Sequence, residues 1–525
     1  MSANQRTTTA LAILLAPALV MGTALALASA WLMPLTVFGA ALTFIAVLGL
    51  VNCSNFNPAE NFCAKRPALS LYFCGVLTYL IAFHWLSATM QKFSGLPAIA
   101  AGGFFALFCL ISALQFPLFH FFNSKIHAPL KKLGCSLLAP AISWIAAQEL
   151  FIRIFPWTPG HALIAVPELA QLAYVASANG CTVFLFLLAS LLLEKTSRVK
   201  NAALAALLFG AAYFFGAQRL ANWGITTNSA EISVALVQGN ISVEEKHSRA
   251  LLRANVQRYF TASMQADSAT ALDLIVWPES VLLDPISSTT PAMPGLALPN
   301  ATLLLGALSY DSPESFYNSA FGVAPRSGKT SEPYHKQILM PFGEYTPGLK
   351  LFPFLKNLNE NAAEFSAGTH QVLIPVTLKT DENQAAQRSP IQIAPLICYE
   401  DVVSSLANIA ALNGAQVLVN MSNDGWFGTS VAARQHHQIA SWRAVETGLP
   451  LLRTTNTGFT AVVNHFGITE AQLPEHQPGV LFAKVKLGTG PLKFGARSAD
   501  IFWHWLSYAV LLGALLLAAR KRRKV

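Results

Sequence analysis

Charged residues are scarce in this chain. Only 12% of its 525 residues are Asp, Glu, Lys or Arg, whereas 53% are hydrophobic. An ordinary soluble domain has roughly 25% charged residues, so this composition predicts a membrane protein with a soluble part. The net charge of +9 comes from basic residues spread over loop ends. Because a nucleic-acid-binding surface gathers such residues on one face, no nucleic-acid partner is expected.

Cysteine is also scarce. The chain has 7 cysteines, and Cys398 is the only one between residues 223 and 495. It therefore has no partner for a disulfide within that region. On the oxidising side of a membrane such a thiol is either inert and buried or kept for its chemistry. The sequence also lacks Cys and His at the spacings of zinc sites, so neither a metal nor a cofactor is expected.

Long apolar runs, by contrast, are abundant. Most approach the roughly 20 residues that cross a bilayer. The segment "ALASA" (26–30) also resembles a signal-peptide cleavage site, but cleavage there would leave the rest of the topology unchanged. Eight transmembrane helices are predicted, near residues 9–30, 32–52, 69–89, 97–122, 134–154, 178–194, 201–217 and 500–519.

Lys and Arg are concentrated in alternate loops between these runs. They follow the second, fourth, sixth and eighth runs, the last of them in the tail 520–524. Such loops face the cytoplasm, so both termini are predicted inside and the long polar region outside. The predicted domains are a seven-helix bundle at 1–222, an outer domain at 223–495, and an eighth helix with a basic tail at 496–525.

The outer region has the pattern of a soluble α/β domain, with short β-type runs between amphipathic helices. Two of its strands end abruptly, "LIVWPES" at Glu279 and "IQIAPLICYE" at Cys398, and "PYHKQILMPFGEY" carries Lys336 and Glu344. A thiol needs a base to become a nucleophile, and an oxyanion needs a positive or N–H partner. Glu, Lys and Cys could supply both, although the spacing alone is a weak signal.

These segments also resemble a known family. "WPES", "YHK" with "PFGEY", and "CYE" resemble the Glu-Lys-Cys set of the nitrilase superfamily, and "SNDGWFG" and "RTTNTGFT" narrow the match. With the apolar runs, the chain resembles the membrane-bound apolipoprotein N-acyltransferase family. The resemblance implies an extracytoplasmic α-β-β-α sandwich on eight transmembrane helices. It also implies the inner membrane of a Gram-negative bacterium, with the sandwich facing the periplasm.

The resemblance further implies an activity. Members transfer an acyl chain from a phospholipid, usually phosphatidylethanolamine, to the N-terminal amine of the diacylglyceryl-cysteine of an apolipoprotein. Cys398 would be the nucleophile, Glu279 the general base and Lys336 the oxyanion partner. Further support in the active site would come from Glu344, Tyr399 and Glu400.

Other segments are expected at the substrate. His247 stands where the family has a Trp after a Lys, and Trp426 and Phe427 lie in "SNDGWFG". The stretch 345–358 is apolar but broken by Pro and Gly, which predicts a mobile loop at the bilayer surface with Phe352 and Phe354 in the acyl boundary. A buried connection to the core is the alternative.

The sequence leaves the roles of several residues open. Glu149 and Arg153 fit either an ion pair at a helix end or a contact with lipid headgroups. Turn chemistry explains Asn423 and Asp424 about as well as catalysis does. The neighbours 436 and 437, both His, are predicted on the surface or behind the site, facing different ways.

Two other classes of protein remain possible from the sequence. A membrane-anchored amidase or nitrilase explains the Glu-Lys-Cys set but not seven helices ahead of the domain. A transporter with an outer binding domain predicts membrane-embedded charges and paired broken helices. The apolar runs carry few charges, and the sequence shows no internal repeat.

Overall fold

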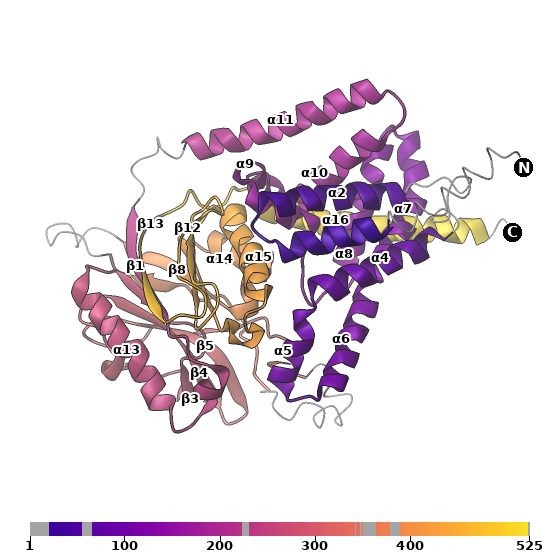
Figure 1. The fold of residues 1–525 in the computed structure, drawn as a ribbon. Coiled ribbons are helices and arrows are strands. Elements are labelled where there is room, and N and C mark those ends of the chain that lie inside the picture. The colour runs from indigo at the N-terminus through magenta and orange to yellow at the C-terminus, as the bar shows by residue number, and fades with distance from the viewer. Residues whose placement is uncertain are drawn as a thin grey trace, which may run out of the picture. The chain divides into compact units, whose positions relative to one another are not determined.

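The computed structural model describes residues 20–54, 66–222, 230–341, 343–346, 349, 364–378 and 389–522. The chain divides into two compact units. The helical unit comprises residues 1–87, 98–223 and 493–525, and the sheet unit comprises residues 88–97 and 224–492. Figure 1 shows both units with their elements labelled.

The helical unit consists of apolar helices with short connections. Two of them begin with a proline at the first helical position, where the missing N–H would have no intrahelical partner. The elements in chain order are Val20–Leu32, α2 (Val37–Ser54), α4 (Pro67–Ala82), α6 (Ala98–Ser112), α7 (Gln115–Lys132), η1 (Ser136–Leu138), α8 (Ala139–Leu150), η2 (Pro159–Ala165), α9 (Pro167–Ala170), α10 (Ala173–Leu193), α11 (Arg198–Asn222) and α16 (Ala496–Arg522). Helix α5 (Trp85–Ser94) belongs to the sheet unit from residue 88 on.

Within the described residues, five helices are long and apolar enough to cross a membrane, or six if the pair α4 and α5, bent by 56°, counts as one span. The expected span at 134–154 contains the short 3-10 helix η1 and the 12-residue helix α8. The run expected at 97–122 instead continues through α6 and α7 to Lys132. The first expected span lies partly outside the described residues. The count of eight stays a prediction.

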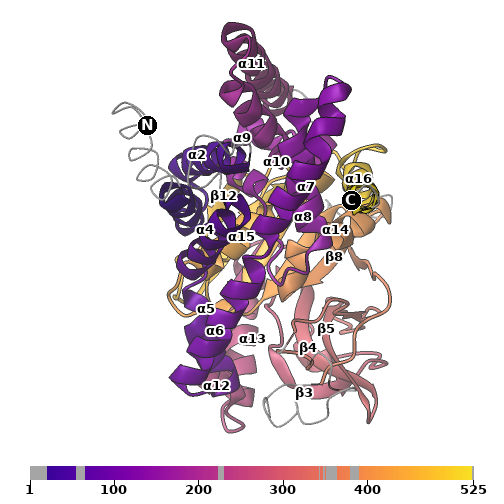
Figure 2. The ribbon, with the colours of Figure 1, turned by 90° about the vertical axis from the view of Figure 1, so that its right-hand side faces the viewer.

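Aromatic side chains hold the helical unit together around α8. Trp144, which is buried, lies in stacked geometry with Phe186 of α10, and the ring centroids are 5.4 Å apart. Phe116 and Phe119 of α7 meet the same indole edge-on. Such pairs add about 0.5–1.5 kcal/mol each beyond the area they bury. The C-terminal helix α16 also packs on α8 and α10, as Figure 2 shows from the side.

Two mixed sheets form the centre of the sheet unit. One has the strand order β13-β1-β2-β4-β5-β6 with β3 beside β4, and the other has the order β12-β11-β10-β9-β8-β7. Their strands are β1 (Glu231–Gln238), β2 (Leu274–Val276), β3 (Leu282–Ser287), β4 (Thr302–Ser312), β5 (Ser315–Val323), β6 (Tyr334–His335), β7 (Ile374–Val376), β8 (Ile391–Ile397), β9 (Val417–Ser422), β10 (Leu451–Thr455), β11 (Ala461–Val463), β12 (Thr469–Gln472) and β13 (Gly479–Lys486).

Helices cover the outer faces of both sheets. α13 (Leu252–Ala269) packs its apolar side on the first sheet, and α14 (Ser404–Leu412) and α15 (Ala432–Thr447) pack on the second. A third cluster, which includes Val234 and Val419, fills the space between the sheets. The sheet unit is therefore an α-β-β-α sandwich, and Figure 1 shows α13 and α15 on opposite sides of it.

The ends of the strands bring the polar residues together. Cys398 directly follows β8, and Glu279 comes three residues after the end of β2. Lys336 directly follows β6. In open α/β sheets, functional groups gather at the carboxyl ends of parallel strands. Here β1, β2 and β4 run parallel to one another in the first sheet, as do β8, β9 and β10 in the second.

Candidate active site

Cys398 lies in an abrupt turn from strand to helix. β8 ends at Ile397, and Cys398 opens the short helix η6 (Cys398–Val402) with a φ of 52°. A positive φ is uncommon for a residue other than glycine and is kept only where neighbours impose it. Asn420 of β9 imposes it here, because its Nδ2 donates to the carbonyl oxygens of Leu396 at 3.2 Å and Cys398 at 3.0 Å.

Lys336 is held between two carboxylates. Its Nζ lies 2.7 Å from Glu344 Oε2 and 3.5 Å from Glu279 Oε1. The side chain of Lys336 is 1% exposed. Burial alone would lower the pKa of this ammonium, but the carboxylates of Glu344 and Glu279 raise it above its ordinary value. Lys336 is therefore a permanent positive charge in the site.

Asn318 joins the two carboxylates from the side opposite Lys336. This buried residue of β5 donates from Nδ2 to Glu279 Oε1 at 2.8 Å and to Glu344 Oε1 at 3.1 Å. Its Oδ1 accepts from Ser280 Oγ. Asn318 was not singled out from the sequence, where it stands with the polar Ser319 just before the apolar end of β5, "AFGV".

The surroundings of Cys398 keep its thiol protonated at rest. Burial raises the thiol pKa well above its ordinary value, and the charge of Glu279 raises it further, whereas Lys336 and a hydrogen bond with Ser422 oppose the shift. A thiolate, and not a thiol, is the effective nucleophile. The site therefore requires a base. Among the carboxylates, Glu279 is the one whose charge raises the thiol pKa most.

Glu400 connects the nucleophile turn to the segment that carries Lys336. It is fully buried. Its Oε2 accepts from the backbone N of Ile397 at 2.7 Å and from Tyr334 Oη at 2.9 Å, and its Oε1 accepts from the backbone N of Gln337 at 2.6 Å and Ile338 at 3.1 Å. Burial raises its pKa to about 7 against these donors. Tyr399, between Cys398 and Glu400, is partly buried.

Four buried charges lie behind this turn. Arg453 Nη1 is 3.0 Å from Asp424 Oδ2, and its Nε is 3.6 Å from Asp401 Oδ2. His436 contacts Asp401 through Nε2 and lies 3.6 Å from Asp424 Oδ1 through Nδ1. With His436 protonated, two positive and two negative charges balance. From the sequence, turn chemistry and catalysis explained Asp424 about equally well. In the structure its carboxylate is an ion-pair partner of Arg453.

The two adjacent histidines are not on the surface. The side chain of His436 is 10% exposed, and His437 is fully buried, with its ring stacked on Phe459 at 4.2 Å. The prediction that they face different ways is confirmed, because His437 Nε2 meets Thr469 and not the charged cluster. In the helical unit, Arg153 Nη2 lies 3.8 Å from Glu149 Oε1, so the ion pair read from the sequence is present.

The expected substrate residues are only partly described. His247 ends the short helix α12 (Val243–His247), and its ring centroid is 5.9 Å from that of Trp426. Trp426 and Phe427 belong to η7 (Asp424–Phe427), where Lys92 Nζ donates to Gly425 O at 3.2 Å. Phe352 and Phe354 lie outside the described residues, so the loop prediction is not tested.

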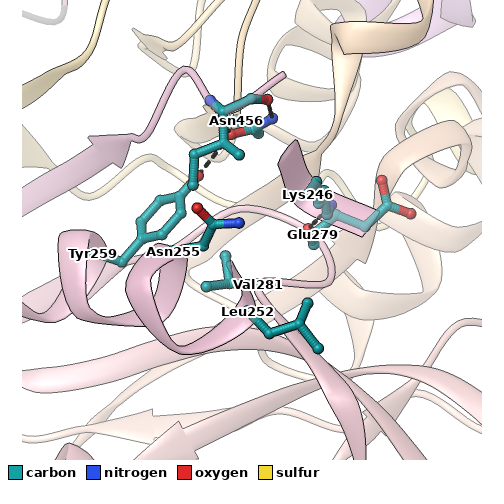
Figure 3. Close-up of a pocket in the computed structure, with 8 residues that line it drawn as sticks. Lys246, Leu252, Asn255, Tyr259, Glu279, Val281 and Asn456 are labelled. Atoms are coloured by element: carbon teal, nitrogen blue, oxygen red, sulfur yellow. Dashed lines mark hydrogen bonds between the residues drawn. The ribbon is translucent and has the colours of Figure 1, made fainter. Parts of the chain in front are cut away.

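A narrow pocket lies beside Glu279 (Figure 3). Lys246 of α12 reaches this point, and its Nζ donates to the backbone oxygen of Glu279 at 3.0 Å. In the sequence, Lys246 stands where the family has a Lys before its Trp, but no role was predicted for it. The pocket is lined by Ile241, Lys246, Leu252, Asn255, Tyr259, Glu279, Val281 and Asn456.

The four buried charges predict a pH dependence of stability. Burial and the charge of Arg453, whose Nη2 lies 3.0 Å from His436 Nδ1, lower the pKa of His436, but Asp401 and Asp424 outweigh them and raise the pKa to about 9. Because this value is above the ordinary 6.5, protonated His436 stabilises the fold fully below about pH 6.5, and the contribution is lost as pH rises through about 9. His436→Gln should therefore cost about 3–5 kcal/mol at low pH and less at high pH.

Thermal unfolding in detergent from about pH 6 to 10 measures this difference. The exposed His370, which pairs with Glu332, gives a matched control because exposed ion pairs contribute little. His370→Gln should shift the unfolding temperature little at any pH. A His436→Gln deficit that stays constant across this range would contradict the assignment.

Known proteins resemble this chain in sequence. Residues 233–490 match the carbon-nitrogen hydrolase family. The apolipoprotein N-acyltransferase of Geobacter metallireducens is 28% identical, covering 89% of this chain and 90% of its own, and that of Shewanella oneidensis is 29% identical, covering 85% of each. An amidase of the nitrilase superfamily from Nesterenkonia AN1 aligns with 52% of this chain and 97% of its own at 17% identity and a TM-score of 0.36.

The sequence relatives extend well beyond the sheet unit. They also cover the helical unit, which a soluble carbon-nitrogen hydrolase does not need. The turn at Cys398 and the cluster of Glu279, Lys336 and Glu344 lie inside the matched region. The chain therefore resembles apolipoprotein N-acyltransferases over most of its length, and its residues 233–490 match the carbon-nitrogen hydrolase family.

Proposed function

We propose that this protein transfers an acyl chain from a phospholipid, by way of a thioester on Cys398, to the N-terminal amine of the diacylglyceryl-cysteine of apolipoproteins. The observation that carries the proposal is the placement of the partly buried thiol of Cys398 where the charges of the Glu279–Lys336–Glu344 cluster act on it in a chain with several apolar helices. The relatives named apolipoprotein N-acyltransferase match both parts.

In the first half-reaction, Glu279 takes the proton of the Cys398 thiol. The thiolate attacks the ester carbonyl carbon of the phospholipid, and a sulfur–carbon bond forms. Lys336 stabilises the negative charge on the carbonyl oxygen, together with a backbone N–H near Tyr399. Loss of one such donor costs roughly 2.7–4 kcal/mol of barrier. The ester carbon–oxygen bond then breaks, and the lysophospholipid oxygen leaves with the proton from Glu279.

In the second half-reaction, the amine of the acceptor attacks the thioester carbon. Glu279 accepts the amine proton and returns it to the sulfur when the carbon–sulfur bond breaks. Glu344 and Asn318 hold Glu279 and Lys336 in place throughout. Both halves use one site, so the kinetics are ping-pong. Burial of the site keeps water from the thioester.

The remaining predictions are proposed with this function. Phosphatidylethanolamine is the donor, and no metal or cofactor takes part. Residues 1–222 form seven transmembrane helices, 223–495 the catalytic domain in the periplasm, and 496–525 the eighth helix with its basic tail. The membrane is the inner membrane of a Gram-negative bacterium. His247, Trp426 and Phe427 contact substrate, and Phe352 and Phe354 guide the acyl chain.

A membrane-anchored amidase acting on a small amide is the second candidate, because the carbon-nitrogen hydrolase domain also suits that chemistry. The two differ in what they release. An amidase yields ammonia and a free acid, whereas the acyltransferase yields lysophospholipid and an acylated amine. One assay with both kinds of substrate separates them.

The proposed function predicts the products of a defined reaction. The purified protein, mixed with phosphatidylethanolamine and a synthetic diacylglyceryl-cysteine peptide, should yield a peptide one acyl chain heavier by mass spectrometry. Glu279→Gln should slow this reaction about a hundredfold or more, because it removes the base. Glu332→Gln, which changes an exposed carboxylate, is the control and should react like the wild type. Ammonia release from small amides without peptide acylation would refute the proposal.

The proposed topology predicts the behaviour of fusion proteins. Alkaline phosphatase folds only outside the cytoplasm, where its disulfides form. Fusion after residue 300 should therefore give active phosphatase, and fusion after residue 525 should not. Comparable amounts of both fusions on an immunoblot provide the control. The reverse pattern would place the sheet unit in the cytoplasm.

A further inference from the structure

Lys246 is a second buried ammonium beside the site, and the mechanism above does not use it. The residue is 8% exposed and lies on α12. Its Nζ donates to the backbone oxygen of Glu279 at 3.0 Å, the contact drawn as a dashed line in Figure 3. The carboxylate of Glu279 extends from the same residue toward Lys336 and Asn318.

Local structure gives no reason for a charge at this position. α12 is already fixed by a capping box, in which Ser242 Oγ accepts from Glu245 N and Glu245 Oε2 accepts from Ser242 N. The pocket beside Lys246 is lined partly by the apolar side chains of Ile241, Leu252 and Val281. A buried ammonium is costly unless a negative charge compensates it. The compensating groups must therefore be in the active site.

The ionisable groups that act on Lys246 are those of the reaction. Glu279 acts on it most strongly, and Cys398 acts next. The other acidic residues of α12 are directed elsewhere, because Glu245 pairs with Arg258 in solvent and Glu244 is exposed. Without Lys246, the cluster would hold two carboxylates, Glu279 and Glu344, against the single ammonium of Lys336.

We propose, on the basis of the acyl transfer inferred above, that Lys246 is a positioning residue whose ammonium fixes the main chain of Glu279 and balances the second carboxylate. Glu279 thereby stays ionised and directed at the thiol until it takes the proton. Lys246 keeps its own proton throughout, so each half-reaction stays balanced as written. Its charge offsets the negative charge that moves from Glu279 to sulfur and then to the carbonyl oxygen.

The protonation of Lys246 makes this role testable. Burial lowers its pKa to about 8, and Glu279 and Cys398 limit the decrease. By contrast, Lys336 keeps its charge, because Glu344 and Glu279 raise its pKa. Base-catalysed steps should therefore weaken above about pH 8 in the wild type, as Lys246 loses its proton.

Three variants separate charge from packing. Lys246→Met keeps the apolar stem but loses the charge, and Lys246→Arg keeps the charge at high pH. Asn255 Oδ1, in the wall of the adjacent narrow pocket, accepts no hydrogen bond from any described residue, so it offers an acceptor for the guanidinium. Lys329→Met, which changes an exposed lysine of the same unit, is the control.

Two rates are measured for each variant. The first is alkylation of Cys398 by iodoacetamide, followed by peptide mass mapping, which needs no lipid. The second is acyl transfer from phosphatidylethanolamine to the peptide at about pH 7 and about pH 9.5. Lys246→Met should slow both reactions about a hundredfold at the lower pH, the scale of a misplaced catalytic group. Lys246→Arg should transfer close to the wild-type rate and lack the decline above about pH 8.

The outcomes decide separately on the two proposals. If neither the wild type nor any variant transfers an acyl chain, the proposed function is refuted. Slow alkylation of Cys398 in Lys246→Met would then still support the role of Lys246. Alkylation at the wild-type rate in Lys246→Met would overturn that role. If Lys246→Met does not fold, the pH profile of Lys246→Arg decides, because a decline identical to that of the wild type would also overturn it.

Discussion

The buried ammonium of Lys336 is the constraint on which the rest of the sheet unit depends. A positive charge with 1% exposure is tolerated only with carboxylates beside it, and Glu279 and Glu344 provide them. Because two carboxylates then surround one ammonium, one negative charge is left over. The cluster therefore requires another hydrogen-bond donor and another positive charge. Asn318 supplies the donor, and Lys246 lies close enough to supply the charge.

The same requirement explains how distant segments are fixed relative to the thiol. Glu400 accepts four hydrogen bonds that tie the turn at Cys398 to the segment after β6. Behind it, Asp401 enters the cluster with His436 and Arg453. Each link satisfies a charge that would be costly if left unpaired. The thiol of Cys398 is thus held in a turn of positive φ by the groups around it.

The sequence was sufficient for the residues that end apolar runs. Glu279 and Cys398 end apolar runs, whereas Lys336 follows the polar stretch "PYH", and the roles of these residues, like the α-β-β-α sandwich, were expected only from the resemblance to the nitrilase superfamily. Asn318 and Lys246 were missed because Glu279, with which each forms a hydrogen bond, is more than thirty positions away in the sequence. Helix α8 shows the converse, since an apolar run of 21 residues contains a helix of only 12. Hydropathy measures composition and not where a helix ends.

The central claim is that Cys398 carries the acyl chain. The most direct measurement is the intact mass of the purified protein after mixing with phosphatidylethanolamine in the absence of an acceptor. The account predicts one acyl chain on the peptide that contains Cys398, an equal amount of lysophospholipid, and no added mass on Cys398→Ala. Acylation of the Cys398→Ala protein, or peptide acylation by the wild type without any acylated enzyme, would contradict it.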